Sequence, residues 1–183
     1  IRTIQNVVGP MRQLQIENTS PYLVIHASGR WVKKNYTEQQ FIDLVKGISQ
    51  THQVIITTDE SSSTVFSALY KRFPLVSSEQ LSNKQSKKQR VMIADQFNFD
   101  QWQAVVAMAN GVVTVECGII HIAALYNKRT ISVYDMDNLP HMMYAEYKPW
   151  TDRCIPIICS RAERNPRILQ ALSQDFLLTV ESS

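Results

Sequence analysis

Short apolar runs alternate along the chain with longer segments in which apolar residues recur every three or four positions. The short runs predict buried β-strands, and the periodic segments predict amphipathic helices. The expected strands cover residues 22–26, 53–57, 90–94, 112–115, 130–134 and 154–158. Strands that are apolar throughout are typical of a parallel sheet with helices on both faces. We therefore expect an α/β fold of that kind.

Local signals place the ends of several helices. Thr37 precedes Gln40 by three residues, which is a capping-box pattern, and Asn98 is the expected N-cap of a second helix. Further helices are expected over residues 63–72 and 119–126, and after Asn165, with Pro166 at the first helical position. Residues 135–150 suggest irregular structure, and residues 1–20 a linker or interdomain helix, so the expected domain covers 21–183.

Composition narrows the class of protein. A chain of 183 residues with 44% hydrophobic residues suits one globular domain, and a net charge of +3 is too mild to indicate nucleic acid. The three cysteines Cys117, Cys154 and Cys159 form no CxxC pair and have no histidine pair at zinc spacing. We expect a reduced, cytoplasmic protein without a metal site. No apolar run reaches membrane-spanning length, and the start at Ile1 without a signal-peptide pattern suggests a fragment.

Polar clusters follow three of the expected strands, at residues 26–29, 57–60 and 116–118. Ligands of open parallel sheets bind beyond the carboxyl ends of the strands. A helix starting near Gly118 would direct free backbone N–H groups at an anion such as phosphate, and His121 lies one turn further on. The alternative is that Glu116 and Gly118 serve only as cap and turn.

The segment TVECGIIHIAALYNKRTISVY, residues 114–134, resembles the donor-binding segment of the glycosyltransferase family that contains the bacterial lipopolysaccharide heptosyltransferases. That family carries an Asp-Ser/Thr-Gly-x-x-His-x-x-Ala pattern at this place. Glu116 and Cys117 stand for its acid and hydroxyl residue, while Gly118, His121 and Ala124 match.

Two other segments resemble the same family in the expected order. In IHASGRWVKKNYTEQQF, residues 25–41, Ser28 would supply a hydroxyl and Lys34 the lysine of a Lys-x-Trp motif, with Tyr36 in place of the tryptophan. In FNFDQWQAVVAMANGVVTV, residues 97–115, Phe97 would lie against the adenine. Glu60 is the nearest substitute for an acid found after the second strand.

The resemblance implies the C-terminal, donor-binding half of a GT-B glycosyltransferase, with a Rossmann-like fold. The donor would be a nucleotide sugar, by resemblance ADP-heptose, and the acceptor the lipopolysaccharide core. Lys34 and His121 would stabilise the leaving diphosphate without a cofactor, while the catalytic base would belong to an N-terminal acceptor domain absent from this chain. The implied place is the cytoplasm, with at most peripheral contact with the inner membrane.

Departures from the family keep a second hypothesis open. Cysteine is a weaker hydrogen-bond donor than a hydroxyl, and Asp135 stands where the family has glycine. The alternative is a catalytically silent scaffold or interaction domain with a decayed donor site.

Other candidates stay outside the implied site. We expect His26 in the core. For His141, a contact with the sugar and a plain loop position are equally compatible with the sequence. Three aromatic residues of the same region are expected to pack the loop, namely Tyr144, Tyr147 and Trp150. A basic cluster is interpreted as a solvated loop rather than a lipid contact, namely Lys84, Lys87, Lys88 and Arg90.

Overall fold

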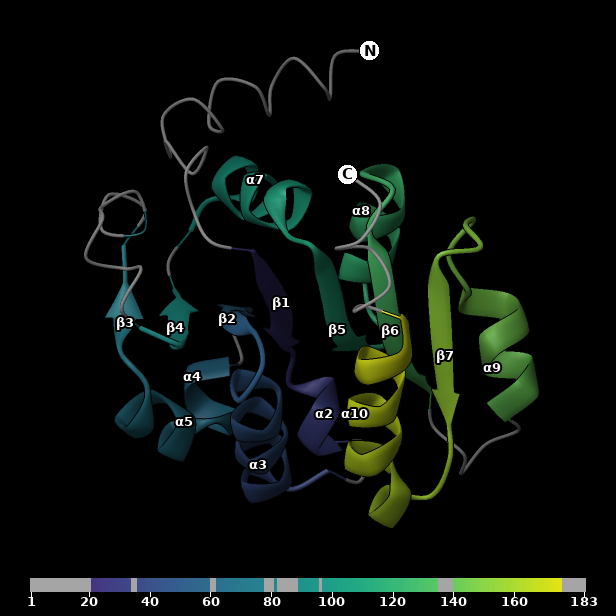
Figure 1. The fold of residues 1–183 in the computed structure, drawn as a ribbon, viewed down its shortest axis with the longest axis horizontal. Coiled ribbons are helices and arrows are strands. Elements are labelled where there is room, and N and C mark those ends of the chain that lie inside the picture. The colour runs from purple at the N-terminus through teal and green to yellow at the C-terminus, as the bar shows by residue number, and fades with distance from the viewer. Residues whose placement is uncertain are drawn as a thin grey trace.

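The computed structural model describes residues 21–33, 36–59, 62–77, 81, 89–95, 97–134 and 140–175. Within them lies one sheet of seven strands, all parallel, in the order β3-β4-β2-β1-β5-β6-β7 (Figure 1). The strands are β1 (Tyr22–Ala27), β2 (Gln53–Thr58), β3 (Leu75–Val76), β4 (Val91–Ala94), β5 (Gly111–Val115), β6 (Arg129–Tyr134) and β7 (Cys154–Ile158).

Helices lie between the strands and after β7, since parallel strands need crossover connections. They are α2 (Arg30–Lys33), α3 (Glu38–Ser49), α4 (Ser62–Val65), α5 (Ser67–Arg72), α7 (Phe99–Met108), α8 (Ile119–Leu125), α9 (Pro140–Tyr147) and α10 (Arg164–Asp175), the last preceded by a 3₁₀ turn, η3 (Arg161–Glu163). The expected α/β, Rossmann-like class is confirmed.

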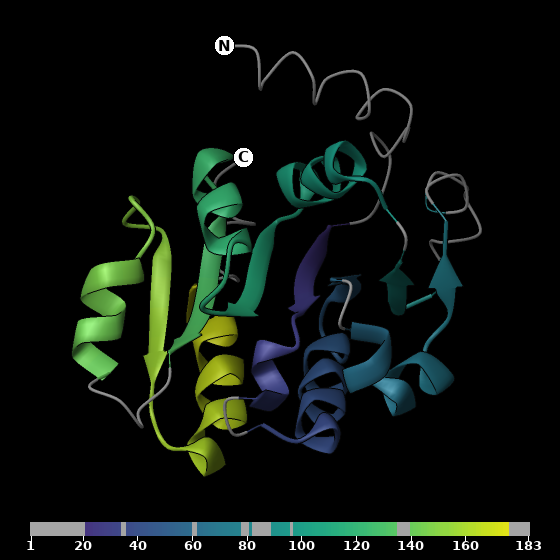
Figure 2. The same ribbon diagram turned by 180° about the vertical axis from the view of Figure 1, so that it is seen from behind.

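The sheet is buried between two hydrophobic clusters because its strands present apolar side chains to both faces. One cluster joins alternate residues of β1, such as Leu23 and Ile25, to α3 and α10. The other joins Tyr22 and Val24 to α7 and α8. The pairs α3–α10 and α7–α8 therefore cover opposite faces, as the two views show (Figures 1 and 2).

The two predicted helix caps are confirmed. The Thr37 hydroxyl accepts from the Gln40 backbone N–H at 3.2 Å, and the Gln40 side chain accepts in return from the Thr37 backbone. Asn98 and Gln101 form the same reciprocal pair at the start of α7. Each cap satisfies backbone donors that the first turn of a helix leaves without partners.

Four local expectations were wrong. A helix over 63–72 is divided at Phe66, because the fully buried Phe66 ring packs on Phe41 at 4.8 Å and its backbone leaves the helical region (φ −118°, ψ 49°). Glu38 then accepts from the Leu69 N–H at 2.9 Å and caps α5. The short strand β3 was not expected, and α9 forms within residues taken as irregular. Pro166 is the third residue of α10, still within the first turn, where no backbone N–H is needed.

The expected linker, residues 1–20, lies outside the described residues.

Candidate functional site

The chain reverses its direction across the sheet between β1 and β5. From β1 it adds β2 and β4 on one side, and then returns to place β5 on the other side of β1. Such a reversal opens a crevice beyond the carboxyl ends of the two strands, where α/β proteins of this type bind their ligands. Figure 1 shows both strands ending beside α2. The segments after β1 and β5, which carry most of the expected site, therefore meet there.

An ion pair joins the two segments across this crevice. Arg30 Nη1 donates to Glu116 Oε2 at 2.9 Å and Oε1 at 3.1 Å, and to the Glu116 backbone oxygen at 3.2 Å. The Arg30 side chain is 51% exposed and that of Glu116 only 11%. The carboxylate is thus sheltered and its charge balanced, while the guanidinium remains open to solvent. The sequence analysis predicted Glu116 as a site residue but did not predict Arg30, because a local motif does not show which cation lies next to the carboxylate.

The turn after β1 sets the position of Arg30. The Ser28 hydroxyl accepts from the Arg30 backbone N–H at 3.3 Å, and the Ser28 carbonyl accepts from the Trp31 N–H at 3.0 Å. Trp31 is fully buried and its Nε1 donates to the His26 carbonyl at 2.7 Å. With Trp31 fixed in the core, its neighbour Arg30 points outward over the strand ends. Ser28, a predicted site residue, is itself buried and supports this turn.

Cys117 turns its side chain inward. Its sulfur lies 3.3 Å from Thr114 Oγ1, accepts from the Ile119 backbone N–H, and packs between the two cores. Burial raises the pKa of the Cys117 thiol, and the Glu116 charge adds to this, although Thr114, Ile119 and Arg30 oppose it. The start of α8 therefore does not lower the pKa of this thiol below its usual range. The Cys117 thiol is directed into the fold and not toward the crevice.

Gly118 and His121 lie on the exposed side of this corner. Gly118 is the N-cap of α8 with ordinary helical dihedrals (φ −54°, ψ −28°), and nothing lies within 4 Å of where a Cβ would stand. The space in front of it is therefore open. The His121 side chain is exposed one turn into α8. The structure thus brings Ser28, Glu116, Gly118 and His121 to the same edge of the sheet.

The remaining predicted contacts are placed only in part. Phe97 follows β4 and is partly buried against the second core, where it precedes the Asn98 cap as a hydrophobic staple residue does. Tyr36 is buried and packs on Trp31 at 5.0 Å, so its ring belongs to the core. Three residues lie outside the described residues, namely Lys34, Glu60 and Asp135.

His26 lies in the core, as expected. Its Nδ1 is 3.0 Å from Thr57 Oγ1, and its ring lies 5.8 Å from that of Trp102. Burial lowers the pKa of His26 to about 4, although the Asp59 charge and the Thr57 hydrogen bond act the other way. The imidazole is therefore neutral near pH 7 and serves packing.

The residues left aside by the sequence analysis have mixed outcomes. Tyr144 packs edge-on against Tyr134 at 5.2 Å, as expected, but Trp150 is 99% exposed, so a packing role for Trp150 is wrong. Arg90 donates to the carbonyls of Ser49 and Gln50 at the end of α3, a favourable place for a cation. The other basic residues of its cluster and the His141 side chain lie outside what the structure describes.

Among the described residues, no three His, Cys, Asp or Glu side chains gather into a group that could hold a metal ion. None of the described helices is both long and apolar enough to cross a membrane.

A parallel sheet of this order, with polar residues of two strand ends meeting at its reversal point, defines a Rossmann-like α/β domain. A sequence model of glycosyltransferase family 9 (heptosyltransferase) matches residues 8–168. The chain belongs to this family. None of the curated protein sequences compared with it matches.

Solved structures of similar fold agree with the family. ADP-heptose lipopolysaccharide heptosyltransferase II of E. coli superposes with a TM-score of 0.65 at 16% identity, covering 97% of this chain and 53% of its own. The E. coli heptosyltransferase WaaC with ADP gives 0.61 at 14% identity, covering 90% and 47%. This chain thus spans about half the length of these enzymes. The C-terminal CMP-Kdo binding domain of WaaA from Acinetobacter baumannii gives 0.54 at 11% identity, covering 98% of this chain and 94% of its own.

Proposed function

We propose that this domain binds the donor of a glycosyltransferase, a nucleotide sugar whose diphosphate lies in the crevice between β1 and β5. The observation that carries the proposal is the Arg30–Glu116 pair at the sheet's reversal point. A bare carboxylate here would repel a diphosphate, but the 2.9 Å pair balances its charge. The exposed Gly118 corner beside it leaves room for phosphate oxygens to approach the backbone.

Adenine is the base we favour, and ADP-heptose the donor. Support comes from family membership and from the similar E. coli structures, one described as an ADP-heptose transferase and one solved with ADP. Phe97, three residues after the end of β4, is the proposed contact of the base. Its side chain is only partly buried, which leaves part of it accessible to a ligand.

The chemical role follows from charge. When the sugar is transferred, negative charge develops on the leaving diphosphate, and cations fixed nearby stabilise it electrostatically. We assign the stabilisation of this charge to the Lys34 ammonium and to a hydrogen bond from His121, while Arg30 forms an ion pair with Glu116 and so balances its charge. The base that deprotonates the acceptor hydroxyl, and the lipopolysaccharide-core acceptor itself, belong in this proposal to an N-terminal domain. The coverage supports it, since a separate C-terminal binding domain is matched over 94% of its length.

A silent scaffold is the second candidate. The inward sulfur of Cys117 favours it, because the hydroxyl that the family motif offers a ligand at this position is replaced by a group used within the fold. In that case the crevice would bind no nucleotide.

Calorimetric titration with ADP separates the two candidates. The proposal expects saturable ADP binding, weaker binding of UDP, GDP and CMP, and no sugar transfer by this chain alone. A matched control is Lys46→Gln, which removes a cation paired with Asp43 at 3.3 Å on the outer face of α3 and should bind ADP unchanged. No binding of any of the four nucleotides would favour the scaffold. Sugar transfer by this chain alone would contradict the two-domain proposal.

A further inference from the structure

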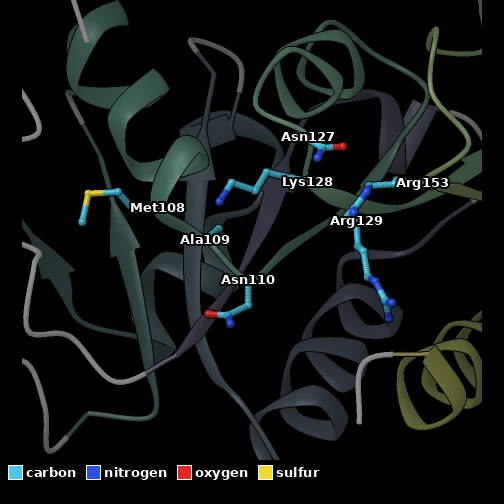
Figure 3. A pocket seen from close by; sticks show the side chains of 7 residues that line it. All are labelled: Met108, Ala109, Asn110, Asn127, Lys128, Arg129 and Arg153. Carbon is cyan, nitrogen blue, oxygen red and sulfur yellow. The ribbon is translucent and has the colours of Figure 1, made fainter. Parts of the chain in front are cut away.

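A pocket lies at the opposite end of the strands from the Glu116 corner. Its volume is about 320 Å³. Seven residues line it, namely Met108, Ala109, Asn110, Asn127, Lys128, Arg129 and Arg153 (Figure 3). Asn110 directly precedes β5, Arg129 begins β6 and Arg153 directly precedes β7, so the pocket stands at the amino ends of these strands. The five residues of β5, at about 3.3 Å each, separate it from the Glu116 corner by roughly 17 Å.

The lining is basic. Three of the seven side chains are cationic, two are amides, and none is a carboxylate. Lys128 is half-buried, and burial lowers its pKa without any carboxylate among the causes that would raise it. Within the described residues, the ion pairs of the structure involve neither Lys128 nor Arg153. A partly desolvated cation of this kind gains from an anion, because no charge of the described fold already balances it.

The C-terminal ends of α7 and α8 also border the pocket. Their partial negative charge is an alternative explanation for the cations at this place. The α8 end, however, is closed by its own backbone. Asn127 adopts a left-handed conformation (φ 55°), and the N–H groups of Asn127 and Lys128 donate to the carbonyls of Ala124 and Ala123 at 3.0 and 2.8 Å. This is a Schellman ending, which leaves the Lys128 ammonium unused. Two helix ends carry about half a negative charge each, which is less than the two positive charges of Lys128 and Arg153.

The loop before β7 adds an aromatic residue. Trp150 is 99% exposed and stands three residues before Arg153. An exposed tryptophan in the same loop as an arginine fits a surface that meets lipid headgroups, where the ring and the cation interact with the same layer.

We propose that this amino-edge pocket binds a phosphate group carried by a ligand, with Lys128 and Arg153 as its cations. The phosphate belongs either to an anionic phospholipid headgroup or to a soluble compound. The site is independent of the donor crevice and does not rest on the proposed function.

The first arm of the test follows backbone amide NMR shifts during titration with inorganic phosphate. We expect saturable shifts at Asn110, Lys128 and Arg153. Lys128→Met, which keeps most of the aliphatic stem, should weaken phosphate binding there about tenfold, as expected for one charge-assisted contact. Lys46→Met is the matched control and should change nothing, and Arg30→Gln should leave the pocket's affinity intact. Thermal unfolding of Lys128→Met checks that the fold is retained, and Arg153→Gln provides a second variant.

The second arm distinguishes the two sources of phosphate by co-sedimentation with vesicles. For a lipid headgroup, the protein should sediment with phosphatidylglycerol vesicles but not with phosphatidylcholine vesicles. Lys128→Met should reduce this retention, and Trp150 fluorescence should shift to shorter wavelength. Phosphate binding at the pocket without retention on vesicles assigns the site to a soluble ligand. The proposal is overturned if phosphate shifts only the Gly118 corner, or nothing, and vesicle retention is absent or equal in Lys128→Met and Lys46→Met.

Discussion

Removing the Arg30 cation should expose a bound diphosphate to the charge of Glu116. The pair is close, with Nη1 and Oε2 2.9 Å apart, and the carboxylate is the sheltered partner at 11% exposure. In Arg30→Gln the carboxylate keeps its place, but the charge that balanced it is gone. We expect weaker ADP binding with little change in the binding of adenosine, which carries no phosphate.

The magnitude follows from Coulomb's law. Two unit charges about 6 Å apart, at an effective dielectric constant of about 40 for this half-open crevice, interact by roughly 1.4 kcal/mol. That corresponds to about a tenfold loss of ADP affinity. The effect on folding should be smaller, about 1 kcal/mol or less, because Arg30 is 51% exposed and such pairs are screened by solvent.

A double-mutant cycle measured by calorimetry isolates the cause. Glu116→Gln should bind ADP as well as the unchanged protein or better, and Arg30→Gln combined with Glu116→Gln should recover most of the lost affinity. Raising the salt concentration should shrink the Arg30→Gln effect, because ions screen the repulsion. An Arg30→Gln protein that binds ADP normally, or loses ADP and adenosine equally, would refute the assignment of the diphosphate to this crevice. Lys46→Gln serves again as the control.

Three further predictions concern single residues. Cys117→Ser should change the free energy of unfolding by less than about 1 kcal/mol, since Thr114 and the Ile119 N–H offer partners to the new hydroxyl; a loss above about 2 kcal/mol in urea denaturation would contradict this. The neutral state of His26 should make folding pH-dependent. Its pKa falls from 6.5 unfolded to about 4 folded, so the unfolded chain binds more protons between these values. Stability is then complete above about pH 6.5 and declines as pH falls toward 4, by up to about 3 kcal/mol; a His26→Gln protein with an equally steep decline, measured by denaturation, would show that other groups cause it. Finally, Lys34→Ala should weaken ADP binding more than adenosine binding in calorimetry, by roughly 1.5–3 kcal/mol for a charge-assisted bond to phosphate; equal losses would place Lys34 away from the phosphates.

Periodicity and cap chemistry determined most of the fold. Continuous apolar runs such as residues 22–26 identify strands buried on both faces, and the Thr37–Gln40 and Asn98–Gln101 pairs fix helix starts, because these signals act between residues close in sequence. The family motif around Gly118 likewise lies within a single short segment, so the sequence alone could indicate the corner and its family.

Tertiary packing decided what depends on distant residues. The helix break at Phe66 follows from burial of its ring on Phe41, 25 positions away in the sequence. The pairing of Arg30 with Glu116 exists only because β1 and β5 are neighbours in the sheet. The Cys117 side chain points inward because it packs against both hydrophobic clusters. The basic pocket arises in the same way, from the amino ends of strands that the sheet order brings together. A local sequence pattern shows which charged residues follow a strand. Which opposite charge pairs with them depends on the neighbouring strand, and therefore on the tertiary structure.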